Sequence, residues 1–230
     1  MKTIVILTGA GMSAESGVKT FRDSGGLWEG HDVMEVASPQ AWEADKEMVL
    51  EFYNQRRRQL LTVKPNAGHI GVFDLEENYQ VKIVTQNVDD LHERAGSSDV
   101  LHLHGELFKV RSVFDENDVL DWKKDLILGE LCKKGHQLRP HIVWFGEQVP
   151  MLTKAMEIVQ KADIFVVIGT SMQVYPAASL INYVPSGNPI FFIDPKPTIS
   201  ENAFPNLTII AENATTGVKK LQALLADLSR

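Results

Sequence analysis

Cysteine and basic residues are scarce in this sequence. Of its 230 residues one is a cysteine, Cys132, and a single thiol excludes both an internal disulfide and a metal site built from several thiolates. Cysteine usage of this kind is typical of a reducing compartment. Lys and Arg number 23 against 30 Asp and Glu, for a net charge of -7. This balance argues against a general affinity for DNA or RNA, because binding to phosphate backbones depends on clustered basic residues.

Long hydrophobic runs are missing as well. No stretch approaches the roughly 20 apolar residues that cross a bilayer. Residues 4–7 superficially resemble the start of a secretion signal, but the run is short and ends at Thr8-Gly9, so it predicts a buried strand instead. We therefore expect a cytoplasmic protein with no membrane or nucleic-acid partner. The sequence does not fix the oligomeric state, and a monomer is compatible with it.

What the sequence does contain is an alternation of strands and helices. Short, β-branched apolar runs of strand length alternate with segments of helical pattern. Such alternation requires crossover connections and hence a parallel sheet. We predict an α/β fold with a doubly wound, Rossmann-like parallel sheet. The expected strands cover residues 3–8, 81–85, 164–170, 189–194 and 207–211, and the expected helices cover residues 41–62, 67–77, 88–95, 151–162, 177–183 and 215–228.

Two regions interrupt this alternation. Residues 30–64 are predicted to be mostly helical with no strand, and residues 106–148 to be irregular and charged. We expect both to form a smaller lobe inserted into a larger one, so that residues 1–230 make a single domain. The large lobe would take in about residues 1–29, 65–105 and 149–230, and the small lobe about residues 30–64 and 106–148.

A glycine-rich turn follows the first expected strand. Gly9 and Gly11 allow a tight turn and let main-chain N–H groups approach a pyrophosphate at a helix N-terminus; an ordinary glycine-rich turn is the alternative. The dehydrogenase form of this fingerprint has a second strand that ends in an acidic residue roughly 20 positions later. Here residues 16–28 are predicted to form a loop that carries Phe21 and Arg22. We therefore expect a bound dinucleotide to be covered by a polar flap.

Six sequence blocks, in one order and spread over nearly the whole chain, resemble the motifs of the sirtuin family. They cover residues 9–17 with 20–22, then 85–92, 102–107, 143–147, 169–171 and 194–195. The resemblance implies an NAD-dependent protein-lysine deacylase, with NAD as a co-substrate and acyl-lysine proteins or peptides as partners. In that reaction the acyl oxygen displaces nicotinamide from the ribose, and the products are free lysine, nicotinamide and acyl-ADP-ribose.

Polar residues that follow strands are the expected cofactor contacts. Open α/β sheets bind ligands at the carboxyl ends of their strands, and the side chains of Gln86, Asn87 and Asp89 suit ribose hydroxyls and a carboxamide. Capping of the following helix is the alternative. The resemblance implies that Asn87 and Asp89 shape the nicotinamide pocket, that Asn87 takes part in catalysis, and that Gln86 contacts the ribose. The full expected set is Gly9, Ala10, Gly11, Ser13, Ala14, Glu15, Phe21, Arg22, Gln86, Asn87, Val88, Asp89, Gly169, Thr170, Ser171, Asp194, Pro195, Lys196 and Ala214.

The last members of this set match the family less well. Gly169-Thr170-Ser171 ends an expected strand, and a helix cap is the alternative for it. Asp194 resembles the adenosine-ribose contact of the family, which more often has Asn there, so the hydrogen bonding to that ribose would differ. Ala214 matches the adenine-side position only loosely.

One of the seven histidines, His104, is the expected general base. It ends a short apolar strand around residues 100–103 and precedes Gly105. Imidazole titrates near neutrality, so it can take a proton from a ribose hydroxyl and return it. The resemblance implies that this hydroxyl then attacks the acyl group. We expect His102, two residues earlier, to point to the opposite face and to be structural.

An extended segment is expected to bind the substrate main chain. It consists of Val143, Trp144, Phe145, Gly146 and Glu147, between two prolines. The resemblance favours strand addition, in which the substrate peptide pairs with main-chain groups of this segment. A plain connector between the lobes is the alternative.

Tyr53 and Arg56 are the expected acyl-binding residues. They lie three apart in a helical segment, hence on one helix face, and resemble the pair of the sirtuin class that removes succinyl and malonyl groups. An Arg fork matches a carboxylate with two hydrogen bonds. A solvated basic face is the alternative, because Arg57 and Arg58 stand alongside.

A zinc site is not expected. Most sirtuins carry two cysteine pairs in the small lobe, and this sequence has only Cys132 there. A structural zinc needs four ligands, mostly thiolates, and Cys132 with His136 supplies two at best. Packing must then hold the lobe together. The apolar residues expected to do so are Val119, Leu120, Trp122, Leu126, Ile127, Leu128 and Leu131.

Three other functions could use the same pocket. A protein ADP-ribosyltransferase would pass ADP-ribose to a protein side chain, and protein-bound ADP-ribose would reveal it. A non-catalytic NAD-sensing module would need no base, so the presence of His104 together with Asn87 and Asp89 counts against it. An NAD-dependent dehydrogenase is disfavoured by the absent ribose-binding acid.

Overall fold

A six-stranded parallel sheet forms the larger part of the molecule. The computed structural model describes residues 1–19, 27–28 and 31–228. The strand order is β11-β10-β9-β1-β4-β5, with β1 paired to β4 on one side and to β9 on the other. The strands are β1 (Thr3–Thr8), β4 (Gln80–Thr85), β5 (Val100–His102), β9 (Ile164–Ile168), β10 (Ile190–Ile193) and β11 (Leu207–Ile210). The α/β class predicted from the sequence is confirmed.

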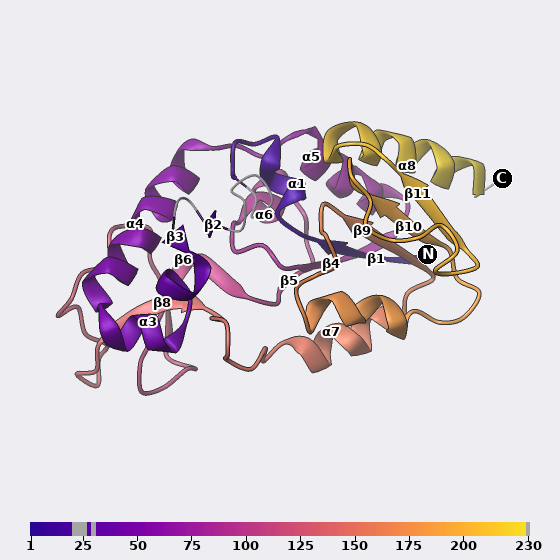
Figure 1. The fold of residues 1–230 in the computed structure, drawn as a ribbon. Coiled ribbons are helices and arrows are strands. Elements are labelled where there is room, and N and C mark those ends of the chain that lie inside the picture. The colour runs from indigo at the N-terminus through magenta and orange to yellow at the C-terminus, as the bar shows by residue number, and fades with distance from the viewer. Residues whose placement is uncertain (20–26, 29–30, 229–230) are drawn as a thin grey trace.

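Helices cover both faces of this sheet. α5 (Ala67–Asp74) and α8 (Ala214–Leu228) lie on one face, and α7 (Leu152–Val159) and the 3₁₀ helix η2 (Ala177–Tyr183) on the other (Figure 1). Ile4 of β1 packs toward the first pair and Val5 toward the second, because successive strand residues point to opposite faces. A strand buried on both faces is continuously apolar, which is why these strands could be predicted. In the described residues, none of the helices is long and apolar enough to span a membrane.

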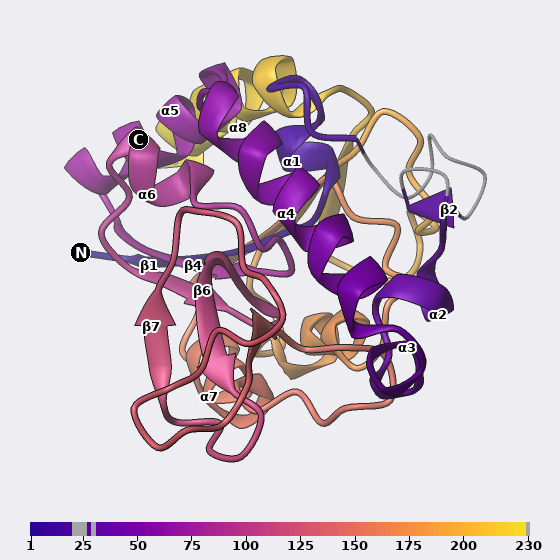
Figure 2. The same ribbon diagram turned by 90° about the vertical axis from the view of Figure 1, so that its left-hand side faces the viewer.

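Three helices and a second sheet form most of the small lobe. It combines α2 (Val33–Val36), α3 (Pro39–Ala44) and α4 (Lys46–Thr62) with a three-stranded antiparallel sheet of order β7-β6-β8 (Figure 2). These strands are β6 (Gly105–Ser112), β7 (Val119–Asp121) and β8 (Leu138–Ile142). The prediction that residues 106–148 are irregular is therefore wrong. The sequence did not predict this sheet because β6 mixes charged and apolar residues without a regular alternation, β7 spans three residues, and β6 pairs with β8 through a register shift between Gly105 and Val110.

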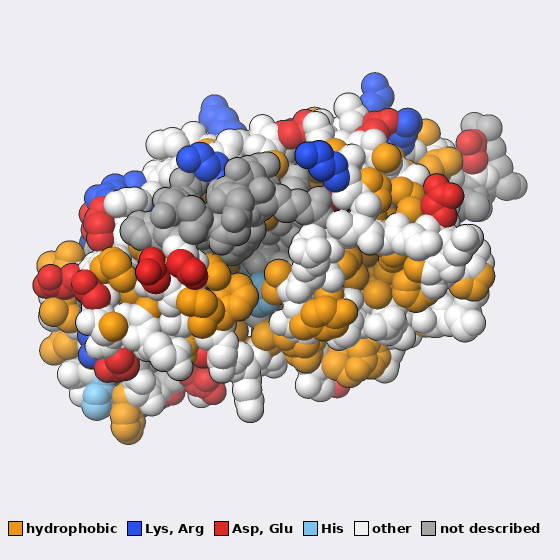
Figure 3. Space-filling model, viewed as in Figure 1, with side chains coloured by type: hydrophobic (Ala, Val, Ile, Leu, Met, Phe, Trp, Pro, Cys, Tyr) orange, Lys and Arg blue, Asp and Glu red, His pale blue; other side chains and the backbone are white. Residues whose placement is uncertain are grey.

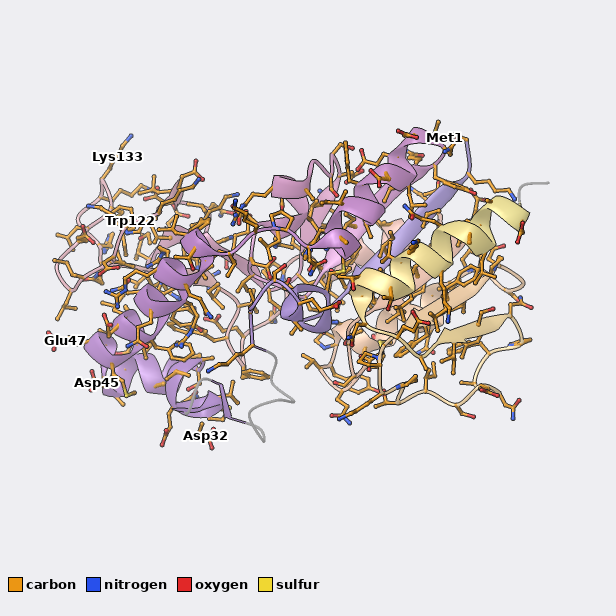
Figure 4. The ribbon with its side chains drawn as sticks, turned by 90° about the horizontal axis from the view of Figure 1, so that it is seen from above. Met1, Asp32, Asp45, Glu47, Trp122 and Lys133 are labelled. Carbon is orange, nitrogen blue, oxygen red and sulfur yellow. The ribbon has the colours of Figure 1, made fainter. Side chains whose placement is uncertain are left out.

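Local capping divides the helical part of the small lobe. The single helix expected over residues 41–62 is two, because Asp45 ends α3 and accepts a hydrogen bond from the Met48 amide (2.9 Å) as the N-cap of α4. Asp45 and Glu47 lie at the end of the molecule remote from Met1 (Figure 4).

β2 (Leu27–Trp28) pairs with β3 (His31–Asp32), so the prediction of no strand in residues 30–64 is also wrong. Two-residue strands are too short to show a period.

The core of the small lobe depends on one buried asparagine as well as on apolar packing. Asn54 Nδ2 donates to the Leu126 carbonyl (3.0 Å), and the Leu126 amide donates back to Asn54 Oδ1 (2.8 Å). Arg57 Nη1 donates to the same Oδ1 (2.7 Å) and its Nε to the Leu107 carbonyl (3.1 Å). Leu126 is fully buried, with Leu120 and Trp122 packed partly against the same core, as expected. The expectation fails for Ile127, Leu128 and Leu131, which are exposed.

Candidate active site

A pocket of about 490 Å³ lies where the carboxyl ends of β1, β4 and β9 face the small lobe. Figure 3 shows the molecule hollowed between its two lobes, with hydrophobic side chains on both sides. In open α/β sheets this is the position where ligands bind, because neighbouring strands there connect in opposite directions. The predicted residues that line the pocket are Gly9, Ala10, Gly11, Ala14, Glu15, Gln86, Asn87, Val88, Asp89, His104, Val143, Trp144, Phe145, Gly146, Glu147, Gly169, Thr170, Ser171, Asp194, Pro195 and Lys196.

The other predicted residues lie elsewhere. Ser13 is buried beneath the pocket wall, and Ala214 packs in the core of the large lobe beside Asn213, which does line the pocket. Phe21 and Arg22 lie outside the described residues. The structure adds residues that carried no sequence signal beyond that of ordinary loop positions. They are Val18, Lys19, Ala37, Ile142, Val149, Val174, Tyr175, Pro176 and Asn213.

The glycines after β1 permit a close contact between two turns. The Gly9 amide donates to the Ile168 carbonyl (3.0 Å), and the Gly11 amide donates to the Gly169 carbonyl (2.8 Å). A Cβ on Gly11 would lie 2.7 Å from Gly169 Cα, and Gly169 has φ 63°, in the left-handed region that glycine readily adopts. These two N–H groups are therefore directed to β9 and not to a pyrophosphate. The glycines shape the pocket floor through their small size.

Asn87 and Asp89 are held in place by Ser13. Asn87 Nδ2 donates to the Gly9 carbonyl (3.0 Å) and to Ser13 Oγ (3.2 Å). Both amide protons are directed inward, so Oδ1 is the atom that Asn87 offers to a ligand. Asp89 accepts hydrogen bonds from Ser13 Oγ (2.9 Å) and the Leu91 amide (3.2 Å), and burial nevertheless raises its pKa above 3.8. The cap position of the following helix, α6 (Leu91–Ala95), is taken by Asp90, so the helix-cap alternative is wrong for Asp89.

Two buried histidines below Ser13 were missed by sequence reasoning. His69 Nδ1 accepts a hydrogen bond from the Asn66 amide (3.3 Å), so Nε2 carries the proton and faces Ser13 Oγ at 3.5 Å. The His69 ring packs on the His92 ring with centroids 4.9 Å apart, and His92 Nε2 lies 3.1 Å from Thr8 Oγ1. Burial lowers the pKa of His69 to about 4 and that of His92 well below 6.5. Both rings are therefore neutral near pH 7, and the only local signal was the helix-cap spacing of Asn66 and His69.

The tautomer of His104 is set by one main-chain group. Nδ1 lies 3.0 Å from the Gln86 carbonyl oxygen, and a carbonyl can only accept, so Nδ1 carries the proton. Nε2 of the neutral ring is then an unprotonated acceptor, as a general base requires. The ring lines the pocket beside Asn87 and Val143.

His102 supports the same loop from the adjacent position. Its Nδ1 lies 2.9 Å from the Asn87 carbonyl and its Nε2 lies 2.8 Å from Glu93 Oε1. Burial by itself would lower the pKa of His102, but the Glu93 carboxylate outweighs it and the pKa is raised. The structural role expected of His102 agrees with these contacts. The expected opposite orientation is wrong, because residues two apart on an extended chain share a face.

The pH profile is expected to show an acid limb centred below pH 6.5. Burial lowers the pKa of His104 below 6.5, and the Gln86 bond offsets this only in part. The base acts when unprotonated, so kcat/KM should rise with pH through this pKa and then level off. A profile on an acyl-peptide at saturating NAD measures it. A limb centred above pH 6.5 that disappears in His102→Gln would contradict the assignment.

Arg56 lies beside the large pocket, whereas Tyr53 contacts the pocket only through the side chain of Trp144. Arg56 lines a second cavity of about 50 Å³, which shares Val18, Lys19, Val88 and Asp89 with the large pocket. The Arg56 guanidinium lies 4.2 Å from the centre of the Phe52 ring, and Nη1 donates to the Phe52 carbonyl (3.1 Å). Tyr53 is fully buried, and its hydroxyl accepts a hydrogen bond from Trp144 Nε1 (3.0 Å).

The far end of the pocket lies over β10 and α8. Asp194 follows β10, is 3% exposed, and accepts a hydrogen bond from the Lys196 amide (2.8 Å). Glu15 accepts from the amide (3.0 Å) and the hydroxyl (2.8 Å) of Thr215. These bonds fix the walls around Asn213, which is the pocket residue next to Ala214.

The described residues include no group of three or more His, Cys, Asp or Glu arranged to hold a metal ion. Cys132 is buried with Sγ 3.6 Å from Ser112 Oγ, and its amide donates to the His136 carbonyl (2.8 Å). The His136 ring stacks on Phe114 at 4.4 Å between centroids. Cys132 thus contacts Ser112, and the His136 ring contacts Phe114.

Fold and pocket together define a doubly wound α/β protein with an unprotonated imidazole nitrogen at a ligand pocket. Residues 9–176 match the Sir2 family. An NAD-dependent protein deacylase of Helicobacter pylori strain J99 is 56% identical over 231 residues, covering 100% of this chain and 97% of the relative. A crystal structure of a Sir2 homologue with NAD is 39% identical, with a TM-score of 0.87 and coverage of 99% and 90%. A Sir2 complex with a deacetylated p53 peptide and 3′-O-acetyl ADP ribose is 27% identical, with a TM-score of 0.82 and coverage of 96% and 93%. The chain belongs to the Sir2 family.

Proposed function

We propose that this Sir2-family enzyme is an NAD-dependent protein-lysine deacylase that prefers succinyl and malonyl groups over acetyl. A Helicobacter pylori relative is named an NAD-dependent protein deacylase, one solved relative holds NAD, and another holds a deacetylated peptide with 3′-O-acetyl ADP ribose. The observation that carries the proposal is the fixed tautomer of His104, whose Nε2 is an acceptor in a pocket of about 490 Å³. That volume lies within the range of small-molecule and cofactor sites.

The two ends of the pocket present different chemistry to NAD. Asn87 Oδ1 and the buried Asp89 carboxyl are acceptors for the carboxamide of nicotinamide, and both are held by Ser13. Thr170 and Asp194 follow β9 and β10 at the other end, where hydroxyl and carboxylate groups suit the adenosine ribose. This arrangement aligns the nicotinamide ribose with the middle of the pocket, near His104.

His104 supplies the proton acceptor for the second half of the reaction. In the first half, the acyl oxygen of the substrate attacks the ribose carbon of NAD that carries nicotinamide, and nicotinamide leaves. Nε2 then takes the proton of a ribose hydroxyl, which attacks the acyl carbon. Because burial keeps the pKa of His104 below 6.5, the ring is unprotonated at neutral pH and ready to act as a base.

The preference for acidic acyl groups is supported by the surroundings of Arg56. The small cavity that Arg56 lines adjoins the large pocket through Val18 and Val88 and has Lys19 as a second cation. The Tyr53 hydroxyl oxygen accepts a hydrogen bond from Trp144 Nε1 and carries its own proton. Burial raises the pKa of Tyr53 well above its ordinary value, so this proton is retained. The Arg56 guanidinium is the group proposed to bind the acyl carboxylate, and the fully buried Tyr53 contacts the pocket through Trp144.

Replacing Arg56 with methionine is expected to lower kcat/KM for a succinyl-peptide by about tenfold or more, because a charge-assisted fork is worth about 1.5–3 kcal/mol. The acetyl-peptide should lose little, since it has no carboxylate. The experiment incubates wild type and variant with NAD and matched succinyl-, malonyl- and acetyl-peptides and quantifies nicotinamide and acyl-ADP-ribose by mass spectrometry.

The matched control is Arg58→Met. Arg58 lies on the same helix, is half exposed, and pairs with Glu51 and Asp125, so its loss should leave the acyl preference unchanged. Desuccinylation that survives intact in Arg56→Met would overturn the acyl preference and leave the deacylase activity standing. Protein-bound ADP-ribose in place of acyl-ADP-ribose would instead identify a transferase.

A further inference from the structure

A buried ionic cluster packs against residues 143–147, the segment expected to bind the main chain of the substrate. Arg139 Nη1 donates to Glu147 Oε1 (2.7 Å) and Nη2 to Oε2 (3.2 Å), and Arg111 Nη2 adds a contact to Oε2 (3.3 Å). The Arg139 guanidinium also lies 3.3 Å from the centre of the Trp144 ring. Both arginines are 9% exposed. The cluster thus joins β6 and β8 of the small lobe to the segment that lines the pocket.

Three successive amides of that segment are directed into the protein. The Val143 amide donates to the His104 carbonyl (2.9 Å), the Trp144 amide to Glu147 Oε2 (2.8 Å), and the Phe145 amide to the Ala37 carbonyl (2.9 Å). The Glu147 amide then donates back to the Trp144 carbonyl (3.0 Å). These bonds close a turn whose exposed members are Phe145 and Gly146, so the prediction of an extended segment is wrong for residues 144–147.

Gly146 shows why the turn needs an external support. Its φ is 91°, and a Cβ there would meet open space, so the backbone conformation and not a steric contact requires glycine. A glycine in a solvent-facing turn has many accessible conformations in isolation. Glu147 limits them, because one of its oxygens accepts the Trp144 amide while both accept the Arg139 fork.

Stability alone does not account for such a cluster. A buried ion pair is often no more stabilising than apolar residues of the same volume, because desolvation offsets the attraction. Burial by itself would raise the pKa of Glu147, yet the Arg139 bonds outweigh it and the pKa is lowered. The carboxylate is therefore charged at neutral pH and needs the arginines. What the pair adds beyond packing is a fixed direction for the main chain of residues 144–147.

We propose that Arg139, acting through Glu147, is a positioning residue that holds the Phe145–Gly146 turn in the shape to which the main chain of the substrate peptide adds. This inference rests on the proposed deacylase function. Arg139 contacts the Glu147 carboxylate and the Trp144 ring, and it does not line the pocket. Glu147 is expected from the sequence to bind substrate. Here its carboxylate mainly connects Arg139 to the main chain of Trp144.

Kinetics on a peptide and on a minimal substrate distinguish this positioning role from a general loss of folding or activity. Strand addition uses the main chain on both sides of the modified lysine, whereas Nε-succinyl-lysine blocked at both ends has almost no main chain to pair. Wild type should favour the peptide in kcat/KM. Arg139→Met should raise the KM for the peptide by about tenfold, and leave the KM for NAD, kcat and the minimal substrate within about twofold. Glu147→Gln should raise the ratio of the peptide KM to the minimal-substrate KM by a similar factor.

The experiment measures both substrates with wild type, Glu147→Gln, Arg139→Met and Arg139→Lys, with Arg58→Met as the control. Glu147→Gln keeps an acceptor for the Trp144 amide, so it decides the question if Arg139→Met does not fold. Arg139→Lys should recover part of the peptide affinity, because a lysine restores charge but not the fork.

Two results would overturn the inference. One is an unchanged peptide KM in folded Glu147→Gln, and the other is a parallel loss on peptide and minimal substrate. Wild type that releases no nicotinamide with either substrate would refute the deacylase function itself, which is a separate outcome.

Discussion

Replacing His104 with alanine is expected to lower acyl-ADP-ribose formation by about 10²–10⁴-fold, the usual contribution of a positioned general base. The Gln86 carbonyl holds Nδ1 as the donor, so Nε2 is the basic atom of the ring, and alanine supplies no acceptor. Single-turnover reactions with a succinyl-peptide and NAD, analysed by mass spectrometry, measure the loss.

Nicotinamide exchange provides the internal control for this variant. Exchange of labelled nicotinamide into NAD requires attack by the acyl oxygen but not the later proton transfer to His104, so it should fall much less than product formation. His136→Ala, on the small lobe beside Phe114, should keep full turnover. If His104→Ala retained the wild-type rate, the assignment of the base would be wrong.

Asp89→Asn is expected to make the protein more stable and less active. The pKa of Asp89 in the folded chain lies above its ordinary value of 3.8 because of burial. As the pH rises, the unfolded chain loses this proton first, so stability falls between the two pKa values and the loss persists at neutral pH. Asparagine removes the charge and keeps an oxygen for the Ser13 hydroxyl. About 1 kcal/mol would raise Tm by about 2–4 °C in a chain of this size.

The activity of the same variant should fall by about tenfold to a hundredfold in kcat/KM for NAD, because a hydrogen bond to a charged group is worth about 1.5–3 kcal/mol. Thermal unfolding at pH 7 and at a pH below 3.8 tests the stability half, and the difference from wild type should vanish at the lower pH. Asp99→Asn is the matched control, since Asp99 is a partly exposed carboxylate that pairs with Lys82. A variant that is less stable than wild type at pH 7 would contradict the electrostatic argument.

The large lobe could be predicted because its signals are local. Strands such as β1 and β9 are buried on both faces, so they appear as uninterrupted apolar runs. The small lobe gave no such signal. β6 has partly exposed, charged positions, β8 has a buried arginine and a proline among its five residues, and β2 and β3 span two residues each.

The candidate site divides in the same way. The polar residues that follow β4, β9 and β10 could be recognised from their position at strand ends, and most of them line the pocket. His69 and His92 could not, because their contacts with Ser13 and Thr8 join segments 56 and 84 residues apart. Arg139 looked like an ordinary residue of an irregular region, since the three-stranded sheet that carries it was not foreseen.

The amino-acid sequence by itself determined the α/β class, the family and the choice of His104 as base, because periodicity and short motifs are properties of neighbouring residues. The tertiary structure alone decided which nitrogen of His104 is the acceptor, how Ser13 orders Asn87 and Asp89, and what supports the Phe145–Gly146 turn. Each of these depends on a hydrogen bond between residues distant in the chain, and its geometry exists only after the lobes have packed.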